Sequence, residues 1–253
     1  MGPALSLEIH DVGPARPLRR SASSFPDPNE ADANGAVAMR GGLAPETIVE
    51  ACRQGIVPSP HPDEHGLWFS PDPRAIIVPC NLHVSRRLDR TIRSCELYVS
   101  LDGAFERVLG ACAERGDGKW ITAEYRRAYL RLHELGWAHS FEVWTVSGEL
   151  AGGLYGLNVG GLFGVESIFY AVPDASKIAM VAMAQHVQNI GVTLIDVRTM
   201  TPHLGNMGAV AIPRSEYLEW VRAVSSRQVA FAGGPCDPGQ VPLEHFVSFN
   251  TLF

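Results

Sequence analysis

Hydrophobic residues follow two different periods along this chain. Residues 123–135 repeat apolar positions at helical spacing, and Thr122 stands before them where an N-cap is expected. After this helix the period changes to the alternation that is typical of strands, with tight glycine turns between the segments. The pattern therefore predicts an antiparallel meander. Its three strands are residues 140–146, 150–158 and 162–169.

A helix and a returning strand follow the meander. Pro173-Asp174 opens the helix, with Asp174 as the expected cap, and its run 178–184 is apolar on all sides, which predicts burial. Residues 193–198 read as the next strand, and residues 214–224 as a final helix. This order is typical of the core of N-acyltransferases of the acetyl-CoA type. We therefore predict an α+β fold with an acetyltransferase-like (GNAT-type) core, a mostly antiparallel sheet flanked by helices, and a smaller N-terminal α/β subdomain.

Composition changes along the chain and predicts four parts. Residues 1–24 are rich in Pro, Arg and Ser and show no periodicity, so we expect a poorly ordered segment. Residues 25–95 form the smaller N-terminal subdomain, and residues 96–224 the catalytic domain. Residues 225–253 are rich in Gly and Pro and are expected to be an irregular tail.

A run of arginines follows Ser85, which is placed to cap a helix that continues to Ser94. A solvated helix face would explain this run, and a stripe that contacts phosphates is the alternative. The stripe alone does not decide between them. Its members are Arg86, Arg87, Arg90 and Arg93.

Composition and charge narrow the function classes. The net charge of −6 gives no global reason to expect a nucleic-acid partner, so any RNA contact requires a local patch. The 5 cysteines are scattered without metal-ligand spacing, which indicates reduced thiols. No signal peptide and no apolar run of membrane-spanning length occurs. We expect a cytoplasmic protein without a membrane partner.

Two acids lie inside apolar strands, where a carboxylate needs a partner. They are Glu166 and Asp196. Arg198 follows Asp196 by two positions, so in a regular strand both project from the same sheet face. Arg198 would pair with Asp196 or stabilise a developing oxyanion. We expect all three at a catalytic site, and a structural hydrogen bond remains the alternative for each acid.

The segment before the buried helix also limits which class of acyl donor the core can bind. Residues 171–179 contain proline and no glycine, so they lack the Gly-rich turn whose N–H groups would bind a pyrophosphate. The core is therefore predicted to use an activated acyl donor other than acetyl-CoA.

A series of motifs along residues 25–224 resembles, in the same order, the leucyl/phenylalanyl-tRNA–protein transferases. The motifs are FPDP (25–28), PETIVEACRQGIVP (45–58), WFSPDPRAIIVP (68–79), LHVSRRL (82–88), KWIT (119–122), AYLRLHELGWAHSFEVW (128–144), GGLYGL (152–157), ESIF (166–169), DASKIA (174–179), LID (194–196) and PHLGNMGAVAIPR (202–214).

The resemblance implies transfer of an amino acid from the 3′ end of an aminoacyl-tRNA to the α-amine of a protein N-terminus. Aminoacyl-tRNA is then a co-substrate, and no metal or other cofactor is expected. The implied aminoacyl pocket comprises Leu154, Tyr155, Phe163, Ser167, Ile168, Phe169 and Tyr170. The implied region for the donor adenosine comprises Trp120, Trp68 and Ser59. The implied contacts to tRNA phosphates are Arg74, Arg86, Arg87, Arg90 and Arg93.

Two departures from the family pattern keep other functions open. Ser59 stands where the family has a tryptophan, and Arg198 where it has a glutamine. One alternative keeps the aminoacyl-tRNA donor but uses a small-molecule amine or hydroxyl as acceptor. The other is a non-catalytic protein that binds RNA.

Overall fold

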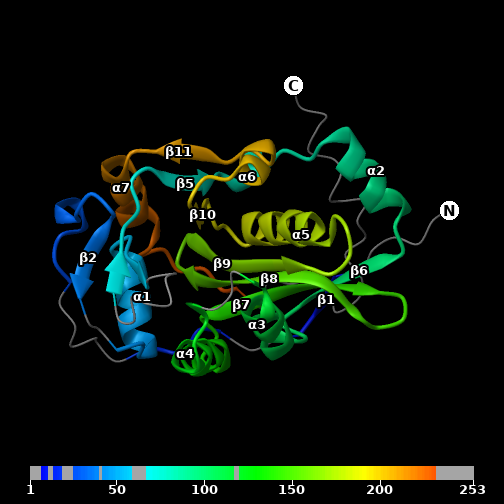
Figure 1. Cartoon of the computed structure of the whole chain (residues 1–253), viewed down its shortest axis with the longest axis horizontal. Helices are drawn as coiled ribbons and strands as arrows, with labels where there is room; N and C mark the ends of the chain where they lie inside the picture. Colours follow the sequence, from blue (N-terminus) through cyan, green and yellow to red (C-terminus); the bar gives the residue numbers. More distant parts are fainter. Residues whose placement is uncertain are drawn as a thin grey trace.

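The computed structural model describes residues 7–10, 14–18, 25–39, 42–58, 67–116 and 120–231. Helices and strands alternate along this part of the chain (Figure 1), which confirms a mixed α and β protein. The finer prediction of an acetyltransferase-like core stays a prediction here. Predictions that fall on Ser59 and on residues 232–253 lie outside the described residues.

Within the described residues the main sheet has 8 strands, in the order β1-β6-β7-β8-β9-β10-β5-β11. Its strands are β1 (Leu7–Ile9), β5 (Arg74–Ile77), β6 (Leu97–Leu101), β7 (Ala138–Thr145), β8 (Leu150–Val159), β9 (Leu162–Tyr170), β10 (Leu194–Arg198) and β11 (Val210–Ile212). A smaller sheet holds β2 (Ala36–Met39), β4 (Leu67–Phe69) and β3 (Val57–Pro58).

The predicted meander is confirmed, because β7, β8 and β9 pair antiparallel in sequence order. β10 then lies parallel to β9, and α5 (Ala175–Asn189) makes the crossover between them. β5 pairs antiparallel with the other edge of β10. The strand that carries both Asp196 and Arg198 is therefore enclosed between two neighbours.

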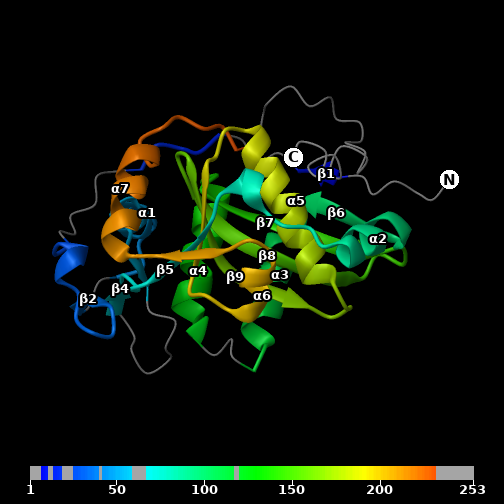
Figure 2. The same ribbon diagram turned by 90° about the horizontal axis from the view of Figure 1, so that it is seen from above.

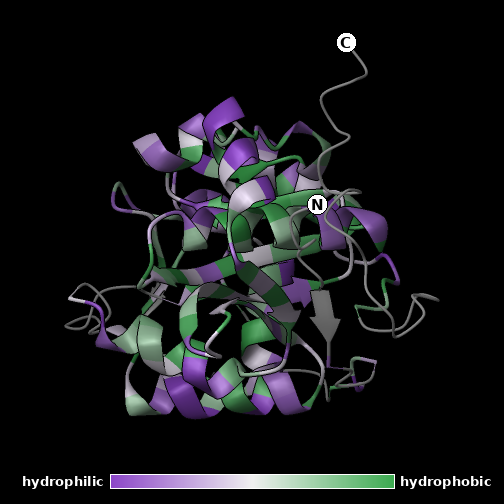
Figure 3. Ribbon diagram, turned by 90° about the vertical axis from the view of Figure 1, so that its right-hand side faces the viewer, coloured by the Kyte–Doolittle hydropathy of each residue, from purple (hydrophilic) through white to green (hydrophobic). Residues whose placement is uncertain are grey.

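Helices cover both faces of the main sheet. α5 packs on one face, while α3 (Phe105–Glu114) and α4 (Ala123–Glu134) pack on the other (Figure 1). Seen from above, α5 crosses over β7 and β8 (Figure 2). Hydrophilic residues gather on the outer turns of the helices, and hydrophobic residues on the strands between them (Figure 3). The remaining helices are α1 (Pro45–Arg53), α2 (Arg86–Ser94), α6 (Pro202–Asn206) and α7 (Arg214–Val224), with short 3-10 turns at Pro28–Glu30 and Pro79–Asn81.

Local rules account for several helix starts. The Ser85 and Thr122 hydroxyls each accept a hydrogen bond from the backbone N–H three residues later, at 3.2 Å, as predicted for N-caps. Asp174 occupies the N-cap position of α5 as predicted, but its side chain makes no capping hydrogen bond. Its backbone is left-handed (φ 65°), and its carboxylate pairs with Lys177 Nζ at 2.5 Å.

The N-terminal part holds two arrangements that hydrophobic periodicity did not reveal. Leu7–Ile9, within the segment expected to be poorly ordered, forms β1 and pairs in parallel with β6. Arg74–Ile77, within the predicted N-terminal subdomain, forms β5 of the main sheet. The boundary between residues 95 and 96 stays a prediction.

The segment after α7 is fixed to the core by Phe231. This side chain is 3% exposed, and its ring stacks on His139 with ring centres 3.6 Å apart. His139 in turn lies 2.7 Å from the buried Asp102 carboxylate through Nδ1. The Phe231 carbonyl accepts a hydrogen bond from His186 Nε2 at 3.1 Å. Residues 225–231 therefore follow a defined path, although the sequence predicted an irregular tail from residue 225.

Candidate functional site

A hollow of about 810 Å³ opens where β9 and β10 separate. The two strands pair only as far as Gly164 and Asp196, and beyond these residues the hollow lies between them. Its lining residues are Arg115, Gly116, Trp120, Val165, Glu166, Ser167, Ile168, Tyr170, Ser176, Val197, Arg198, Thr199, Thr201, His203 and Leu204. Apolar side chains and a small group of charged ones thus face a common space, as in most ligand sites.

A β-bulge in β9 turns Glu166 toward this hollow. Tyr155 of β8 pairs with Ser167 and Gly156 pairs with Val165, which leaves Glu166 as the extra residue. A bulge bends its strand and redirects the extra side chain. The acid that the sequence placed in an apolar strand thereby reaches the hollow.

A second bulge places Arg198. Asp196 pairs with Ile76 and Arg198 with Ala75, so Val197 is the extra residue on β10. Arg198 has a left-handed backbone (φ 65°), which is uncommon for a residue with a side chain and costs about 1 kcal/mol or more. The irregularity separates the side chains of Asp196 and Arg198, which a regular strand would have held on the same face.

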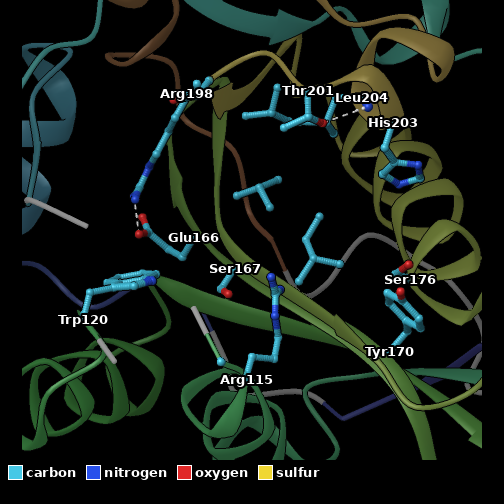
Figure 4. A pocket seen from close by; sticks show the side chains of 15 residues that line it. Arg115, Trp120, Glu166, Ser167, Tyr170, Ser176, Arg198, Thr201, His203 and Leu204 are labelled. Carbon is cyan, nitrogen blue, oxygen red and sulfur yellow. Dashed lines mark hydrogen bonds and ion pairs between the residues drawn. The ribbon is translucent and has the colours of Figure 1, made fainter. Parts of the chain in front are cut away.

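Glu166 and Arg198 form an ion pair beside Trp120 (Figure 4). Arg198 Nη2 donates to Glu166 Oε2, and the Tyr125 hydroxyl donates to the same oxygen at 2.8 Å. The side chain of Arg198 is only 12% exposed, and that of Glu166 only 4%. Burial lowers the pKa of the Arg198 guanidinium, but the opposite charge of Glu166 outweighs it and holds that pKa well above its usual value.

Two further tyrosines support this pair from behind. Tyr129 stacks on Tyr125 with ring centres 4.2 Å apart, and Tyr155 meets Tyr129 edge-on at 5.7 Å. Burial raises the pKa of all three phenols well above the usual value, so each stays protonated at neutral pH. The Tyr125 hydroxyl is therefore a hydrogen-bond donor to Glu166 and not a second negative charge.

Asp196 lies outside the hollow, in a separate buried network. Arg74 Nε donates to Oδ1 at 2.9 Å and Arg74 Nη2 to Oδ2 at 2.5 Å, while the Tyr217 hydroxyl donates to Oδ2 at 3.0 Å. Burial raises the pKa of Asp196, but the Arg74 charge and hydrogen bonds outweigh it, so that the pKa lies below its usual value.

Two residue predictions are corrected by this network. Of the two roles predicted for Arg198, the ion pair with Asp196 does not form, because Arg74 occupies the carboxylate and Arg198 contributes only its backbone N–H, at 2.9 Å. Arg74 was expected to meet tRNA phosphates, but its side chain is 0% exposed. No local pattern indicates this pairing, because it joins residues 122 positions apart.

The predicted aminoacyl pocket divides between the hollow and the core. Ser167, Ile168 and Tyr170 line the hollow. Four others belong to the hydrophobic core instead: Leu154, Tyr155, Phe163 and Phe169. Five other lining residues were not predicted from the sequence. Val165, Val197 and Leu204 are apolar, and Arg115 and His203 are polar. Val165 directly precedes the bulge in β9 and Val197 is the extra residue of the bulge in β10, so their positions in the hollow depend on strand register that one strand's sequence does not reveal.

The two tryptophans predicted for the donor adenosine lie in different places. Trp120 lines the hollow and meets Tyr125 edge-on, with ring centres 5.0 Å apart. Trp68 is 1% exposed and packs against Phe25, so it cannot stack on a ligand in the hollow as Trp120 can. The structure thus brings one of the two aromatic rings to the site.

The arginines predicted on one helix lie together on α2. Arg86, Arg87, Arg90 and Arg93 are all exposed. Arg93 pairs with Asp89 on the same helix at 3.2 Å. Leu88 and Ile92 point inward and are buried, so the arginines occupy the outer face.

Within the part of the chain that the structure describes, no group of three or more His, Cys, Asp and Glu side chains is arranged to hold a metal ion. In the same residues no helix has the length and apolar character required to cross a membrane.

Comparison with known proteins identifies relatives along most of the chain. The family model described as "Leucyl/phenylalanyl-tRNA protein transferase" matches residues 76–222. A protein of that name from Anaeromyxobacter dehalogenans (strain 2CP-C) is 47% identical over 199 residues, which cover 77% of this chain and 85% of the relative. Another from Anaeromyxobacter sp. (strain Fw109-5) is 45% identical over 224 residues, covering 87% of this chain and 94% of the relative.

Among solved structures, L-PGS from Bacillus licheniformis aligns with a TM-score of 0.35 and 11% identity. This alignment covers 52% of the chain and 47% of that structure. A likeness of this size carries no argument about fold or function.

Proposed function

The chain belongs to the leucyl/phenylalanyl-tRNA–protein transferase family, and we propose that its hollow between β9 and β10 is where an amino acid passes from tRNA to a protein N-terminus. The single observation that carries this placement is the Glu166–Arg198 ion pair beside Trp120, at the wall of an apolar hollow. The transfer reaction follows from the family, and the roles of individual residues are our proposal.

The donor enters with its terminal adenosine against Trp120 and its amino-acid side chain in the apolar part of the hollow. Stacking of a base on an aromatic ring is worth about 1–3 kcal/mol. Ile168, Val197 and Leu204 provide a surface for a leucyl or phenylalanyl side chain. This division of the hollow positions the ester carbonyl near Glu166 and Arg198, which lie beside Trp120.

The chemistry requires little more than positioning and charge stabilisation, because the ester of an aminoacyl-tRNA is already activated. The acceptor amine attacks the carbonyl carbon, and the C–N bond forms as the bond to the ribose 3′ oxygen breaks. Arg198 remains cationic and donates a hydrogen bond to the oxyanion. Glu166 accepts the proton of the attacking amine and returns it to the leaving ribose oxygen.

Asp196 takes a positioning role in this scheme. Its carboxylate is held by Arg74 and Tyr217, and Oδ1 accepts the backbone N–H of Arg198. It thereby stabilises the left-handed turn that directs the Arg198 side chain to Glu166. The sequence predicted both acids at the catalytic site, and we assign the proton transfer to Glu166 because Asp196 does not line the hollow.

Three further assignments belong to the same proposal. The exposed arginines of α2 contact tRNA phosphates, which position the RNA without reading its sequence. The sheet, with α5 crossing from β9 to β10, represents an acetyltransferase-like core. The protein works in the cytoplasm, where aminoacyl-tRNA is available. The small-molecule acceptor and the non-catalytic function are not favoured by the relatives.

One assay tests the reaction. The purified protein is mixed with tRNA carrying labelled leucine, phenylalanine or a polar amino acid, and with a peptide that begins with arginine. We expect label from leucine or phenylalanine in this peptide and none in the same peptide with an acetylated N-terminus. Label in the acetylated peptide, or no label with any donor, would contradict the proposal.

A further inference from the structure

A second hollow, of about 850 Å³, lies at the opposite end of the β8–β9 hairpin from the first. It borders the hairpin turn at Gly160, whereas the first hollow borders the end of β9 at Tyr170. Its walls come from the end of α1, the start of β7, the end of β8 and residues 225–230. Among the side chains in these walls are two arginines, a tryptophan and an asparagine: Arg53, Arg227, Trp137 and Asn158.

The wall formed by residues 225–230 is held in place at both ends. At one end the Val224 carbonyl accepts a hydrogen bond from the Gly161 N–H at 2.8 Å. At the other end Phe231 is buried against His139. Gly160 has a left-handed backbone (φ 61°), and a Cβ there would lie 2.5 Å from the Ser225 carbonyl oxygen. The hollow is therefore shaped by close packing.

The charge of this second hollow is positive. Arg53 and Arg227 contribute two guanidinium groups, and none of the described residues that line it is acidic. Glu50 lies 3.5 Å from Arg53, but both side chains are substantially exposed (36% and 44%), so this surface pair is weak. Arg227 uses one nitrogen to donate to Thr193 Oγ1 at 3.2 Å. On a chain with a net charge of −6, this concave surface attracts an anion.

Two other side chains add a flat surface and a hydrogen-bond acceptor. The indole of Trp137 lies beside Arg53, whose guanidinium carbon is 5.7 Å from the ring centre. Asn158 is 6% exposed, and its Oδ1 is buried without a hydrogen-bond partner. An unpaired buried acceptor is unfavourable until a donor reaches it. The amino group of a nucleobase is a donor of the kind that asparagine recognises.

We propose that this second hollow binds a nucleoside monophosphate unit that carries an amino group on its base. Its phosphate contacts Arg53 and Arg227, its base lies along Trp137, and the base amino group donates to Asn158. The unit is a free nucleotide or one nucleotide of an RNA, since the two present the same chemistry. None of the described residues that line this second hollow lines the first one.

The first arm of the test measures binding of AMP and of inorganic phosphate to the full chain by calorimetry. The double variant Arg53→Gln, Arg227→Gln should weaken AMP binding by about tenfold or more, because it removes two charge-assisted contacts. Asn158→Ala should weaken it by about threefold to tenfold. Arg222→Gln, which removes one exposed arginine of α7 outside the hollow, is the control for loss of positive charge elsewhere on the surface and should have no effect.

The second arm measures binding of uncharged tRNA over a range of salt concentrations. Loss of both contacts to this one phosphate should reduce the slope of log affinity against log salt by about 1 in the double variant. Thermal unfolding followed by circular dichroism distinguishes a lost contact from a folding defect, because a folding defect would lower the melting temperature of the variant. Trp120→Ala identifies AMP that binds in the first hollow, since only binding there depends on Trp120.

The two arms identify the source of the ligand. Loss of AMP binding in the double variant supports a free nucleotide, and a reduced slope without AMP binding supports an RNA nucleotide. The proposal is overturned if the folded double variant matches the wild type in both arms. It is also overturned if inorganic phosphate binds as tightly as AMP, because the site would then recognise only an anion.

Discussion

Two arginine–carboxylate pairs lie on either side of one irregular strand, β10, and they differ in burial and partners. Arg74 and Asp196 are 0% and 3% exposed and carry further hydrogen bonds from Tyr217 and the Arg198 backbone. Arg198 and Glu166 are 12% and 4% exposed and border a hollow. The chemistry of the two pairs is the same. Access to a ligand, and the number of partners already present, decide which pair can react.

The comparison also explains why each pair is kept. Two buried charges lose their hydration, and their attraction offsets this loss only when further hydrogen bonds complete the network. The Asp196 network is completed within the protein. The hydrogen bonds that Glu166 accepts from Tyr125 and from Arg198 both end on the same carboxylate oxygen, Oε2. We infer that the second network is completed by the substrate.

The largest effect is expected from Asp196→Asn. This variant leaves the guanidinium of Arg74 buried without its counter-charge, and we expect the free energy of unfolding to fall by about 3–5 kcal/mol. Urea unfolding followed by fluorescence measures it. The control is Arg131→Gln, which breaks an exposed pair with Glu134 and should change stability by less than about 0.5 kcal/mol.

The pH dependence of the same variant sharpens this test. The pKa of Asp196 is lower in the folded protein than its ordinary value of 3.8. The stabilisation by its charge is therefore complete above about 3.8 and is lost as the pH falls through the lowered value. The stability difference between wild type and Asp196→Asn should shrink in strong acid. A difference that stays constant there would contradict the ion-pair explanation.

The second prediction concerns Glu166→Gln, which should impair catalysis more than folding. The amide oxygen can still accept from Tyr125 and Arg198, but it cannot take a proton, so we expect transfer to fall by about 10²–10³-fold. Single-turnover transfer measures this loss. Tyr129→Phe is the matched control, because it changes one of the supporting tyrosines and leaves the carboxylate of Glu166 in place. If Glu166→Gln destabilised the protein as much as Asp196→Asn and spared transfer, the roles of the two pairs would be reversed.

A third prediction separates donor binding from chemistry. Trp120→Ala removes the ring proposed to stack on the terminal adenosine, and we expect affinity for aminoacyl-tRNA to fall by about fivefold to 100-fold. Filter binding with a non-hydrolysable aminoacyl-tRNA measures it. Trp120→Phe keeps a stacking surface and should recover most of the affinity. If the two variants bound aminoacyl-tRNA with equal affinity, the terminal adenosine would not stack on the ring at position 120.

The smallest effect is expected at Ile168. Shortening this side chain to alanine removes part of the apolar surface that contacts the donor side chain, so discrimination between leucyl and polar donors should fall by about tenfold. Competition between two labelled aminoacyl-tRNAs measures the ratio directly. Val146→Ala, a truncation at a 72% exposed position away from the hollow, should leave the ratio unchanged.

The sequence predicted features that depend on neighbouring residues. Helix caps at Ser85 and Thr122 follow from an oxygen-bearing side chain before an amphipathic run, and the meander follows from strict alternation. Burial of Glu166 and Asp196 follows from their apolar neighbours. Pairing across the chain did not follow, because nothing local joins Arg74 to Asp196. The bulges at Glu166 and Val197 were also hidden, since they arise from the register between strands and not from one strand alone.

The bulge at Glu166 makes the length of β9 as important as its composition. β9 has one residue more than β8 between Val165 and Ser167, so removing that residue would let the two strands pair in regular register. The hairpin would stay paired, but no side chain at this position would be redirected into the hollow. Relatives of this protein should therefore vary freely in loop length but hardly at all in the number of residues in this strand.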